Sequence, residues 1–294
     1  MEFFLDLMTN GLLVGLVYSL VAVGFVLIYK ATSIINFAQG DLIMFAGYAA
    51  AVMLGAQGMP IGLMILILCV GMVALGFVLE RGILRPMVGQ PLVSVIMVTI
   101  GLSFVIQGLV AIVWGAATRR LELPVPLDPY IIGPVLISPI DVVAAVIALT
   151  FLIAFGLFFT RSRLGVAMRA VADDQQAAMV VGIRVPRVFA LSWAIAGLAA
   201  AAGGIIWGNK LGASALLSLV GLKVFPVVIL GGLDSIGGAI VGGLIMGAVE
   251  SVAAGYLDPY VGGGTKDFIP YVLMILVLFF KPYGIWGHET IERV

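Results

Sequence analysis

About nine apolar stretches follow one another along this chain, and most are long enough to cross a lipid bilayer. They cover residues 5–29, 38–54, 61–79, 92–114, 140–159, 188–207, 215–230, 236–256 and 268–280. A spanning helix needs roughly 20 apolar residues, because the hydrocarbon core is about 30 Å thick. Lys223 and Pro226 interrupt the seventh stretch, which a re-entrant or broken helix would also explain, so about eight to ten spans fit the sequence. The sequence predicts a polytopic, all-α membrane protein in which residues 1–294 form one transmembrane domain.

The amino-acid composition agrees with this fold class. Hydrophobic residues make up 63% of the chain and charged residues 10%, against roughly 45–50% and 25% in ordinary soluble chains. A membrane β-barrel would alternate apolar and polar residues, which these stretches do not. The net charge of zero gives no indication of a nucleic-acid partner, and the single Cys69 excludes an internal disulfide or a cysteine metal cluster.

The distribution of Lys and Arg predicts how the chain is oriented, because cytoplasmic loops carry an excess of basic residues. With the N-terminus outside, ten of the 15 Lys and Arg residues fall on one side, five of them within 161–187. The first residues include Glu2 and Asp6 but no basic residue, unlike a secretory signal, so we expect the first span to be retained. We therefore expect a periplasmic N-terminus and a cytoplasmic C-terminus.

Residues suited to catalysis or metal binding are nearly absent from the sequence. The one histidine, His288, lies in the C-terminal tail, so the sequence does not support a His-based metal site or a Ser-His-Asp triad. Residues 262–266 (GGGTK) look like a phosphate loop but have the wrong spacing and order, so an external turn explains them better. We expect no catalytic residue, metal site or bound cofactor on this chain, so any ATP hydrolysis would belong to another chain.

The longest polar interval, residues 161–187, predicts a cytoplasmic loop that contains one short helix. Asp173 or Asp174 can cap its start, because a carboxylate accepts the free backbone N–H groups there. Gly182 can take the left-handed position after the last turn, and Pro186 prevents continuation. The apolar face of this helix would consist of Ala177, Ala178 and Val181. A short amphipathic helix on the basic side of a membrane protein predicts a docking surface for a cytoplasmic partner.

Three polar residues, Asn36, Gln39 and Asp41, interrupt apolar sequence at the inner start of the second span. One interpretation is N-capping, in which Asn36 or Asp41 begins the helix and Gly40 is a loop residue. This interpretation accounts for each residue without invoking a substrate. The other interpretation is that these side chains line the inner end of a translocation pathway.

A glycine-rich segment, residues 225–251, predicts a tight turn followed by a closely packed helix. The glycines that flank the turn at 233–236 are Gly231, Gly232, Gly237 and Gly238. The turn also carries a cap for the next helix. Small-xxx-small spacing, which permits close contact between membrane helices, occurs in the pairs Gly238/Gly242 and Gly243/Gly247.

Glu250 lies on the same face of this helix as Gly243, Gly247 and Ala254, so it is expected to point toward packed protein or a cavity. A carboxylate within a membrane span is costly, which favours a function in the pathway. A structural hydrogen bond near the outer interface is the other interpretation, and the sequence leaves both open.

Polar residues recur every four positions in the fourth span, at Thr99, Ser103 and Gln107. Ser and Thr usually satisfy their own helix backbone, so only Gln107 needs a partner. An interhelical hydrogen bond is the first interpretation for Gln107, and a pathway-lining role is the second. A similar packing face on the first span consists of Gly11, Gly15, Tyr18 and Ala22.

Three segments of the chain resemble the LivH-type permease of branched-chain amino acid ABC importers. They are INFAQGDLIMFAGY (35–48), RSRLGVAMRAVADDQQAAMVVGI (161–183) and VILGGLDSIGGAIVGGLIMG (228–247). The likeness extends over essentially the whole chain, in order and with similar spacing. It implies an ABC importer permease of the bacterial inner membrane, which translocates leucine, isoleucine, valine or related small polar solutes by ATP-driven alternating access.

The resemblance also implies partners: a homologous second permease of LivM type, two ABC ATPase subunits that hold ATP and Mg²⁺, and a periplasmic substrate-binding protein. The family's ATPase-coupling helix maps onto residues 173–182. Its Ala-rich, Gly-terminated signature is matched by Ala172, Ala177, Ala178 and Gly182. No substrate-contacting residue is carried over from the family, so the pathway candidates rest on the residues alone. They are Asn36, Gln39, Asp41, Gln107 and Glu250.

An ion-coupled secondary transporter is the alternative function. Glu250 or Asp41 would then couple to a proton or sodium ion, and residues 231–238 would be a helix break that holds substrate. A passive channel and a membrane enzyme have less support, because the sequence has no filter motif, ring of charge or acid–base pair. A purely structural subunit, the exact substrate and the nature of the second permease stay open.

Overall fold

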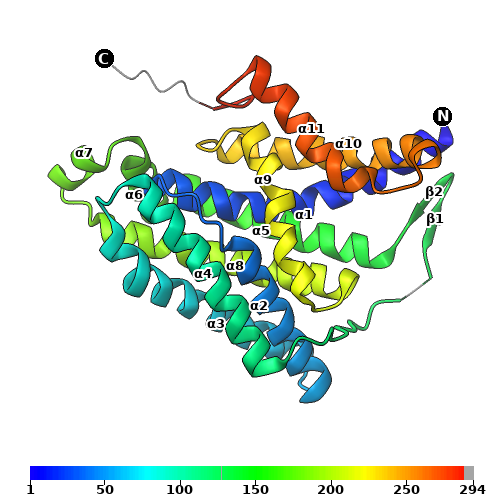
Figure 1. The fold of residues 1–294 in the computed structure, drawn as a ribbon, viewed down its shortest axis with the longest axis horizontal. Helices are drawn as coiled ribbons and strands as arrows, with labels where there is room; N and C mark the ends of the chain where they lie inside the picture. Colours follow the sequence, from blue (N-terminus) through cyan, green and yellow to red (C-terminus); the bar gives the residue numbers. More distant parts are fainter. Residues whose placement is uncertain (127, 288–294) are drawn as a thin grey trace. The chain divides into compact units, whose positions relative to one another are not determined.

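The computed structural model describes residues 1–126 and 128–287, and helices dominate it (Figure 1). The helices are α1 (Glu2–Thr32), α2 (Gln39–Ala51), α3 (Ile61–Leu79), α4 (Leu92–Trp114), α5 (Pro139–Arg161), α6 (Arg163–Asp173), α7 (Gln175–Val180), α8 (Val185–Leu211), α9 (Leu219–Gly231), α10 (Ile236–Val261) and α11 (Thr265–Phe280). π-helical turns continue α2 at Val52–Ala56 and α3 at Glu80–Leu84, and short 3₁₀ helices occur at Arg85–Met87 and Ala215–Ser218. His288 and Arg293, which the sequence places in the C-terminal tail, lie outside the described residues.

Each apolar stretch of the sequence coincides with a helix, which confirms the all-α membrane fold. Within the described residues, seven helical segments are long and apolar enough to cross a membrane. The other two are shorter: the segment Ala215–Gly231 and helix α11. The seventh apolar stretch is indeed broken, because it consists of a 3₁₀ turn (Ala215–Ser218) followed by α9, with Pro226 inside the helix.

The chain divides into two compact units. Unit 1 comprises Met1–Val26, Pro124–Thr150 and Lys223–Val294, and unit 2 comprises Leu27–Leu123 and Phe151–Leu222. Three of the four boundaries fall within α1, α5 and α9, so each of these helices contributes residues to both units, and the fourth lies between Leu123 and Pro124 in the connection before α5.

In unit 1, α1 and α10 pack through glycines so closely that no side chain fits between them. A Cβ atom on Gly11 would lie 2.7 Å from the carbonyl oxygen of Gly247, and one on Gly15 would lie 2.8 Å from that of Gly243. Ser19 extends this contact, because its hydroxyl donates to the carbonyl oxygen of Ile240 (2.8 Å). The small-xxx-small spacing on both helices therefore has the packing role that the sequence predicted.

The other glycine pair of α10, Gly238 and Gly242, faces α9. A Cβ on Gly242 would lie 2.8 Å from the carbonyl oxygen of Val227. Ser235 is the N-cap of α10 and accepts from Gly238 N (3.0 Å), which confirms the capped turn. Gly232 has φ +102°, a conformation that needs glycine. The two glycine pairs thus hold α10 against two different helices.

Unit 2 is built around α8, which packs against α2 and α3. Here too glycines set the distance between helices. A Cβ on Gly204 of α8 would lie 2.7 Å from Gly47 N of α2, and one on Gly197 would contact the carbonyl oxygen of Met72 in α3. Cys69 lies in α3 and is a free thiol.

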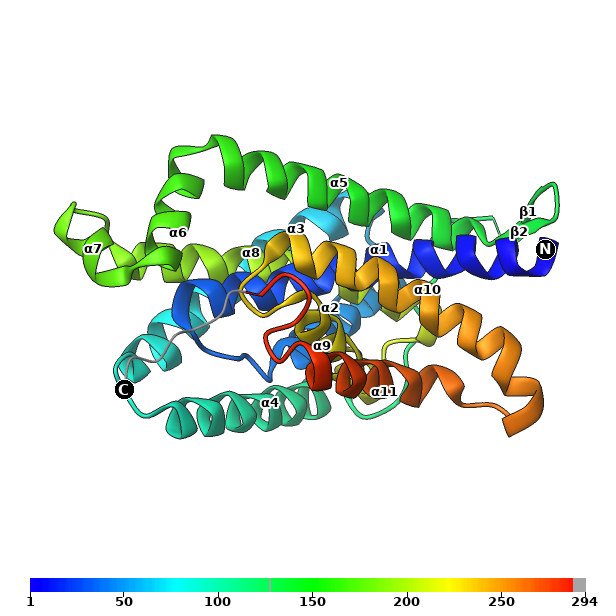
Figure 2. The same ribbon diagram turned by 90° about the horizontal axis from the view of Figure 1, so that it is seen from above.

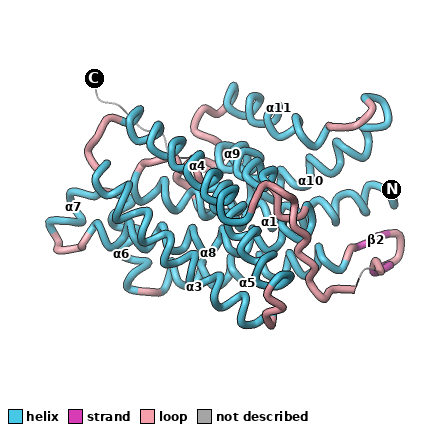
Figure 3. The backbone as a smooth tube through the Cα atoms, turned by 60° about the horizontal axis from the view of Figure 1, so that its bottom comes forward, coloured by secondary structure: helices cyan, strands magenta, loops and turns pink. Residues whose placement is uncertain are grey.

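One element was not predicted from the sequence: an antiparallel hairpin within the Pro-rich connection before α5 (Figure 3). Its strands are β1 (Tyr130–Ile132) and β2 (Val135–Ile137). Asp6 Oδ1 of α1 accepts from Leu136 N (2.8 Å), and Asn10 Nδ2 donates to the carbonyl oxygen of Leu136 (3.1 Å). Strands of three residues carry too little alternation to be found by periodicity.

Candidate functional site

The polar interval between α5 and α8 contains two helices, α6 and α7, where the sequence predicted one (Figure 2). Ser162 caps α6 by accepting from Gly165 N (2.8 Å), and Met168 and Val171 are buried. The guanidinium of Arg169 donates to the carbonyl oxygen of Phe159 and lies over its ring, 5.4 Å from the centroid. In the sequence, Arg169 contributed only to the count of basic residues in the loop. In the structure it joins α6 to the end of α5.

The start and end of α7 are those that the sequence predicted. Asp174 is the N-cap, because its Oδ1 accepts from the backbone N–H groups of Gln176 (2.8 Å) and Ala177 (2.9 Å). The alternative cap is wrong, since Asp173 is the last residue of α6. Gly182 has φ +86°, and the bonds from Gly182 N to Met179 O and from Ile183 N to Ala178 O form a Schellman motif. Pro186 stands in the first turn of α8.

The predicted apolar face of α7 is only partly right. Ala178 is only 2% exposed and packs inward, whereas Ala177 and Val181 are exposed. The residues that present apolar surface are Met179 (55% exposed), Val180 (87%) and Val181 (75%), which we call the α7 tip. Three exposed apolar side chains in sequence, at the end of a polar loop, are a surface suited to contact another protein.

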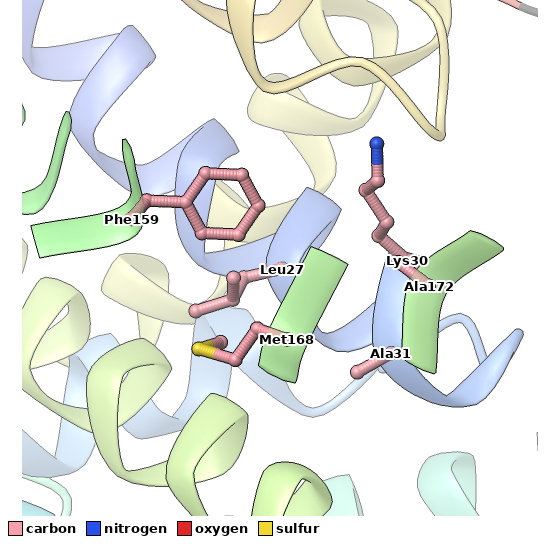
Figure 4. A pocket seen from close by; sticks show the side chains of 6 residues that line it. All are labelled: Leu27, Lys30, Ala31, Phe159, Met168 and Ala172. Carbon is pink, nitrogen blue, oxygen red and sulfur yellow. The ribbon is translucent and has the colours of Figure 1, made fainter. Parts of the chain in front are cut away.

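Helices α6 and α7 lie against the end of α1, and Figure 4 shows the apolar part of this contact. The residues that line the small cavity there are Leu27, Lys30 and Ala31 of α1, Phe159 of α5, and Met168 and Ala172 of α6. Its volume of about 10 Å³ leaves room for one water molecule at most. The ammonium end of Lys30 points away from the other labelled side chains (Figure 4).

The polar part of this contact comes from α7. Gln175 Nε2 donates to the carbonyl oxygen of Ala31 (3.0 Å), across 144 positions of sequence. A larger cavity of about 210 Å³ lies beside Gln175. Its lining residues are Thr32, Ser33, Ile34, Met87, Val88, Gly89, Gln90, Leu92, Val95, Gln175 and Phe189. Nothing in the local sequence singled out Gln175, because a glutamine in a polar loop is unremarkable without its partner.

The N-capping interpretation is wrong for Asp41, which lies inside the first turn of α2, and only partly right for Asn36, whose Oδ1 accepts from Ala38 N (3.1 Å) in the turn before the helix. Helix α2 begins at Gln39, and its N-cap, Ala38, makes no side-chain cap bond. Gly40 lies inside the first turn, where a Cβ would contact the backbone of Gly221 at 3.0 Å, so its role is close packing. Asn36 Nδ2 donates to Gln39 Oε1 (3.3 Å), and Gln39 Nε2 donates to the carbonyl oxygen of Ala196 in α8 (3.2 Å).

Asp41 is 2% exposed and accepts from Gln107 Nε2 of α4 at 2.8 Å. The same Nε2 lies 3.3 Å from Ser103 Oγ. The interhelical hydrogen bond predicted for Gln107 is therefore confirmed, and its partner is one of the other pathway candidates. Unit 2 thus holds two hydrogen-bonded pairs of side chains, Asn36 with Gln39 and Asp41 with Gln107, which we call the α2 polar cluster; Gln107 is half-buried and the other three residues are buried.

Glu250, the remaining pathway candidate, belongs to unit 1 and so lies in a different unit from the α2 polar cluster. It is 6% exposed and hydrogen-bonded to Tyr18 of α1, and Ala254 on the same face is also buried. Its Oε2 atom is buried without a hydrogen-bond partner among the described residues. Glu250 points into the α1–α10 contact, as its helical position predicted.

One further sequence prediction can be placed, that of the glycine turn. Gly262, Gly263 and Gly264 all have positive φ and form the turn between α10 and α11, so the turn interpretation of residues 262–266 is confirmed. In the part of the chain that the structure describes, no three His, Cys, Asp or Glu side chains gather into a group that could hold a metal ion.

A polytopic helical protein with glycine-packed spans, buried polar side chains between them and a short helix displayed on a loop has the construction of a membrane transport permease. The chain belongs to the family described as "Branched-chain amino acid transport system / permease component", whose match covers residues 7–278. This membership makes it a multi-pass permease component of an ABC transport system, and it gives no support to the ion-coupled alternative.

Individual relatives agree with this assignment. The chain is 32% identical to the high-affinity branched-chain amino acid transport system permease protein BraD of Pseudomonas aeruginosa, over 99% of this chain and 98% of BraD. It is 31% identical to LivH of Escherichia coli, with the same coverage. Among solved structures it resembles PsaBC from Streptococcus pneumoniae, solved with a Fab, at a TM-score of 0.52 and 13% identity over 95% of this chain and 93% of that one. The last comparison concerns the fold alone.

Proposed function

We propose that this protein is the permease subunit of an ABC importer for branched-chain amino acids or related small solutes. The observation that carries the proposal is the near full-length similarity to BraD and LivH, whose names state that substrate class. The sparse charge of the spans fits it, because an aliphatic side chain needs little polar recognition from a pathway.

The transporter would contain further chains. We propose a homologous second permease of LivM type, two ABC ATPases that bind ATP and Mg²⁺, and a periplasmic substrate-binding protein. This chain would bind no cofactor itself, which is consistent with a sequence that lacks a phosphate loop of the usual spacing. The α7 tip, with Met179, Val180 and Val181 exposed, is the surface that would dock in an ATPase cleft.

We place α7 on the cytoplasmic side of the inner membrane, the N-terminus in the periplasm and the C-terminus in the cytoplasm. The support is the excess of Lys and Arg in the loops that this orientation puts inside, five of them within 161–187. ATP binding would draw the ATPases together, and α7 would pass that motion to the spans as a rigid-body shift.

Reconstitution tests the function directly. Vesicles that contain the complete transporter, its binding protein and internal ATP should accumulate radiolabelled leucine, and uptake should persist when proton and sodium gradients are dissipated. Uptake without ATP, or loss of uptake when only the gradients are removed, would contradict the proposal. Competition by unlabelled isoleucine, valine and unrelated amino acids measures the substrate range in the same assay.

The orientation has its own test. With Cys69 replaced by alanine, a Val180→Cys variant should react with a membrane-impermeant maleimide only from the cytoplasmic side. The control is Phe3→Cys, near the N-terminus, where Phe3 is 54% exposed. It should react only from the periplasmic side, where we propose that the N-terminus lies. Labelling of both cysteines from one side would contradict the proposed topology.

A further inference from the structure

Helix α7 is too short to hold its own position. Six residues form fewer than two turns, and isolated helices of this length are not stable in water. Its cap at Asp174 and its Schellman end at Gly182 are contacts within the loop, so they define the shape of α7 without fixing its place. The buried Ala178 and the Gln175 side chain attach α7 to the rest of unit 2.

The bond of Gln175 is directed at a helix end. Ala31 lies in the last turn of α1, where backbone carbonyl groups lack partners within the helix and carry partial negative charge. An amide N–H is a suitable donor for such a group, and Gln175 Nε2 supplies it at 3.0 Å. The helix stops just beyond, at Ser33, which has φ +57° although it is not glycine. The side chain of Gln175 thus connects α7 to the C-terminal end of α1, where the helix is followed by a loop.

The hydrogen bond between Gln175 and Ala31 is not supported by close packing on one side, where a cavity lies. The 210 Å³ cavity lies beside Gln175 and separates it from the loop before α4. On the other side the apolar contact of α6 with α1, through Met168 and Leu27, keeps the end of α1 next to the loop helices. A displacement of α7 therefore reaches α1 directly through one hydrogen bond, whereas the apolar contact with α1 belongs to the neighbouring helix α6.

The end of α1 leads directly to the α2 polar cluster. Only five residues, 34–38, separate Ser33 from the start of α2 at Gln39. Asn36 within this loop bonds to Gln39, and Gln39 bonds to Ala196 of α8. Asp41, in the first turn of α2, bonds to Gln107 of α4. A shift of the α1 end would thus act on the hydrogen bonds that join α2 to α8 and α4.

We propose that Gln175 is a positioning residue through which α7 moves the end of α1 and, behind it, the α2 polar cluster. The inference rests on the proposed function, since it assigns a step between ATPase and membrane spans. Gln175 does not touch substrate in this assignment. Its role is to make α7 and the end of α1 move together, so that energy from ATP hydrolysis is used for transport.

The test compares isosteric variants in the complete transporter, with uptake of radiolabelled leucine and ATP hydrolysis measured in the same vesicles. Gln175→Glu keeps the shape of the side chain but replaces the donor by an acceptor. Leucine transported per ATP hydrolysed should fall at least about five-fold, the factor that corresponds to loss of one hydrogen bond. ATP hydrolysis itself and co-purification of the ATPases should stay close to wild type.

Two variants serve as controls. Gln175→Lys restores a donor that can reach the same carbonyl and suits the negative end of α1, so it should recover most of the coupling. Gln176→Glu places the same change on the exposed neighbouring glutamine, and it should couple like wild type. A purely structural role for Gln175 would lower hydrolysis and uptake together and would not separate Lys from Glu.

The outcomes are distinct. Normal coupling in Gln175→Glu, equal loss in Gln175→Lys, or loss of ATPase association in Gln175→Glu would each overturn the inference. Failure of wild-type vesicles to transport any branched-chain amino acid would instead count against the proposed function. A thermal unfolding midpoint of Gln175→Glu within a few degrees of wild type would confirm that the uncoupled variant is folded.

Discussion

Helix α1 is held in two different ways along its length. In unit 1 its first half meets α10 backbone to backbone, with Gly11 and Gly15 against Gly247 and Gly243. In unit 2 its last turn is held by side chains, namely the amide of Gln175 and the apolar Met168. Interlocked glycine surfaces resist displacement because any shift creates overlap. A contact made by side chains can adjust by rotation about their bonds. We infer that the α1–α10 contact is the fixed part and the α1 end the movable part.

The largest effect is expected from breaking the fixed part. Gly247→Leu would place a side chain where a Cβ alone would lie 2.5 Å from Gly15 Cα, so α1 and α10 could not approach. Overpacking of this kind costs about 3 kcal/mol or more. We expect loss of monodisperse protein in detergent, measured by size-exclusion chromatography and thermal unfolding. Gly237→Leu on the same helix is the control, because a Cβ there has no atom within 4 Å. Equal stability of both variants would contradict the interlock.

The next largest effect is expected at the α7 tip, and the quantity measured is binding of the ATPases. Val180→Asp puts a charge into the α7 tip, and burial of an unpaired charge in an apolar contact costs several kcal/mol. We expect ATPase co-purification to fall by at least about thirty-fold while the permease itself stays folded. Gln176→Asp, an exposed change on the same helix, should leave co-purification unchanged. Retention of the ATPases by Val180→Asp would show that the α7 tip is not the docking surface.

A smaller effect should come from the polar cluster behind the α1 end. Asp41→Ala leaves the half-buried Gln107 amide with only its longer 3.3 Å bond to Ser103, which should cost about 1 kcal/mol of unfolding free energy. Adding Gln107→Leu removes the weakly bonded donor and should recover part of that loss. The double-mutant cycle is read from thermal or denaturant unfolding. Strict additivity of the two changes would mean that the pair is not coupled in the folded protein.

The smallest effect is expected at the end of α7. Gly182→Ala introduces a Cβ at φ +86°, which costs about 1 kcal/mol and loosens the Schellman motif. We expect faster limited proteolysis within 175–187 and little change in the global unfolding midpoint. Gly237→Ala, at a glycine without positive φ, is the matched control. Unchanged proteolysis would indicate that the α7 end does not depend on the left-handed glycine.

Much of the fold could be predicted from the sequence, because the signals are local. Apolar stretches of spanning length gave the helices, and glycine spacing gave the contact faces of α1 and α10. Asp174 and Gly182 bounded α7 correctly, since caps act within three or four residues. The prediction that Gln107 needs a partner was also correct, because an amide side chain in the middle of an apolar span has few alternatives.

What the tertiary structure decided concerns partners far apart in sequence. Asp41 looked like a cap, and only the packing of α2 against α4 showed that it accepts from Gln107. The bond from Gln39 to Ala196 likewise depends on the packing of α2 against α8. The inward turn of Ala178 and the bond from Gln175 to Ala31 depend on where the loop folds back. A local pattern specifies whether a side chain needs a partner and which face it occupies. The identity of that partner depends on which helices come together, and that is set by packing of the whole unit.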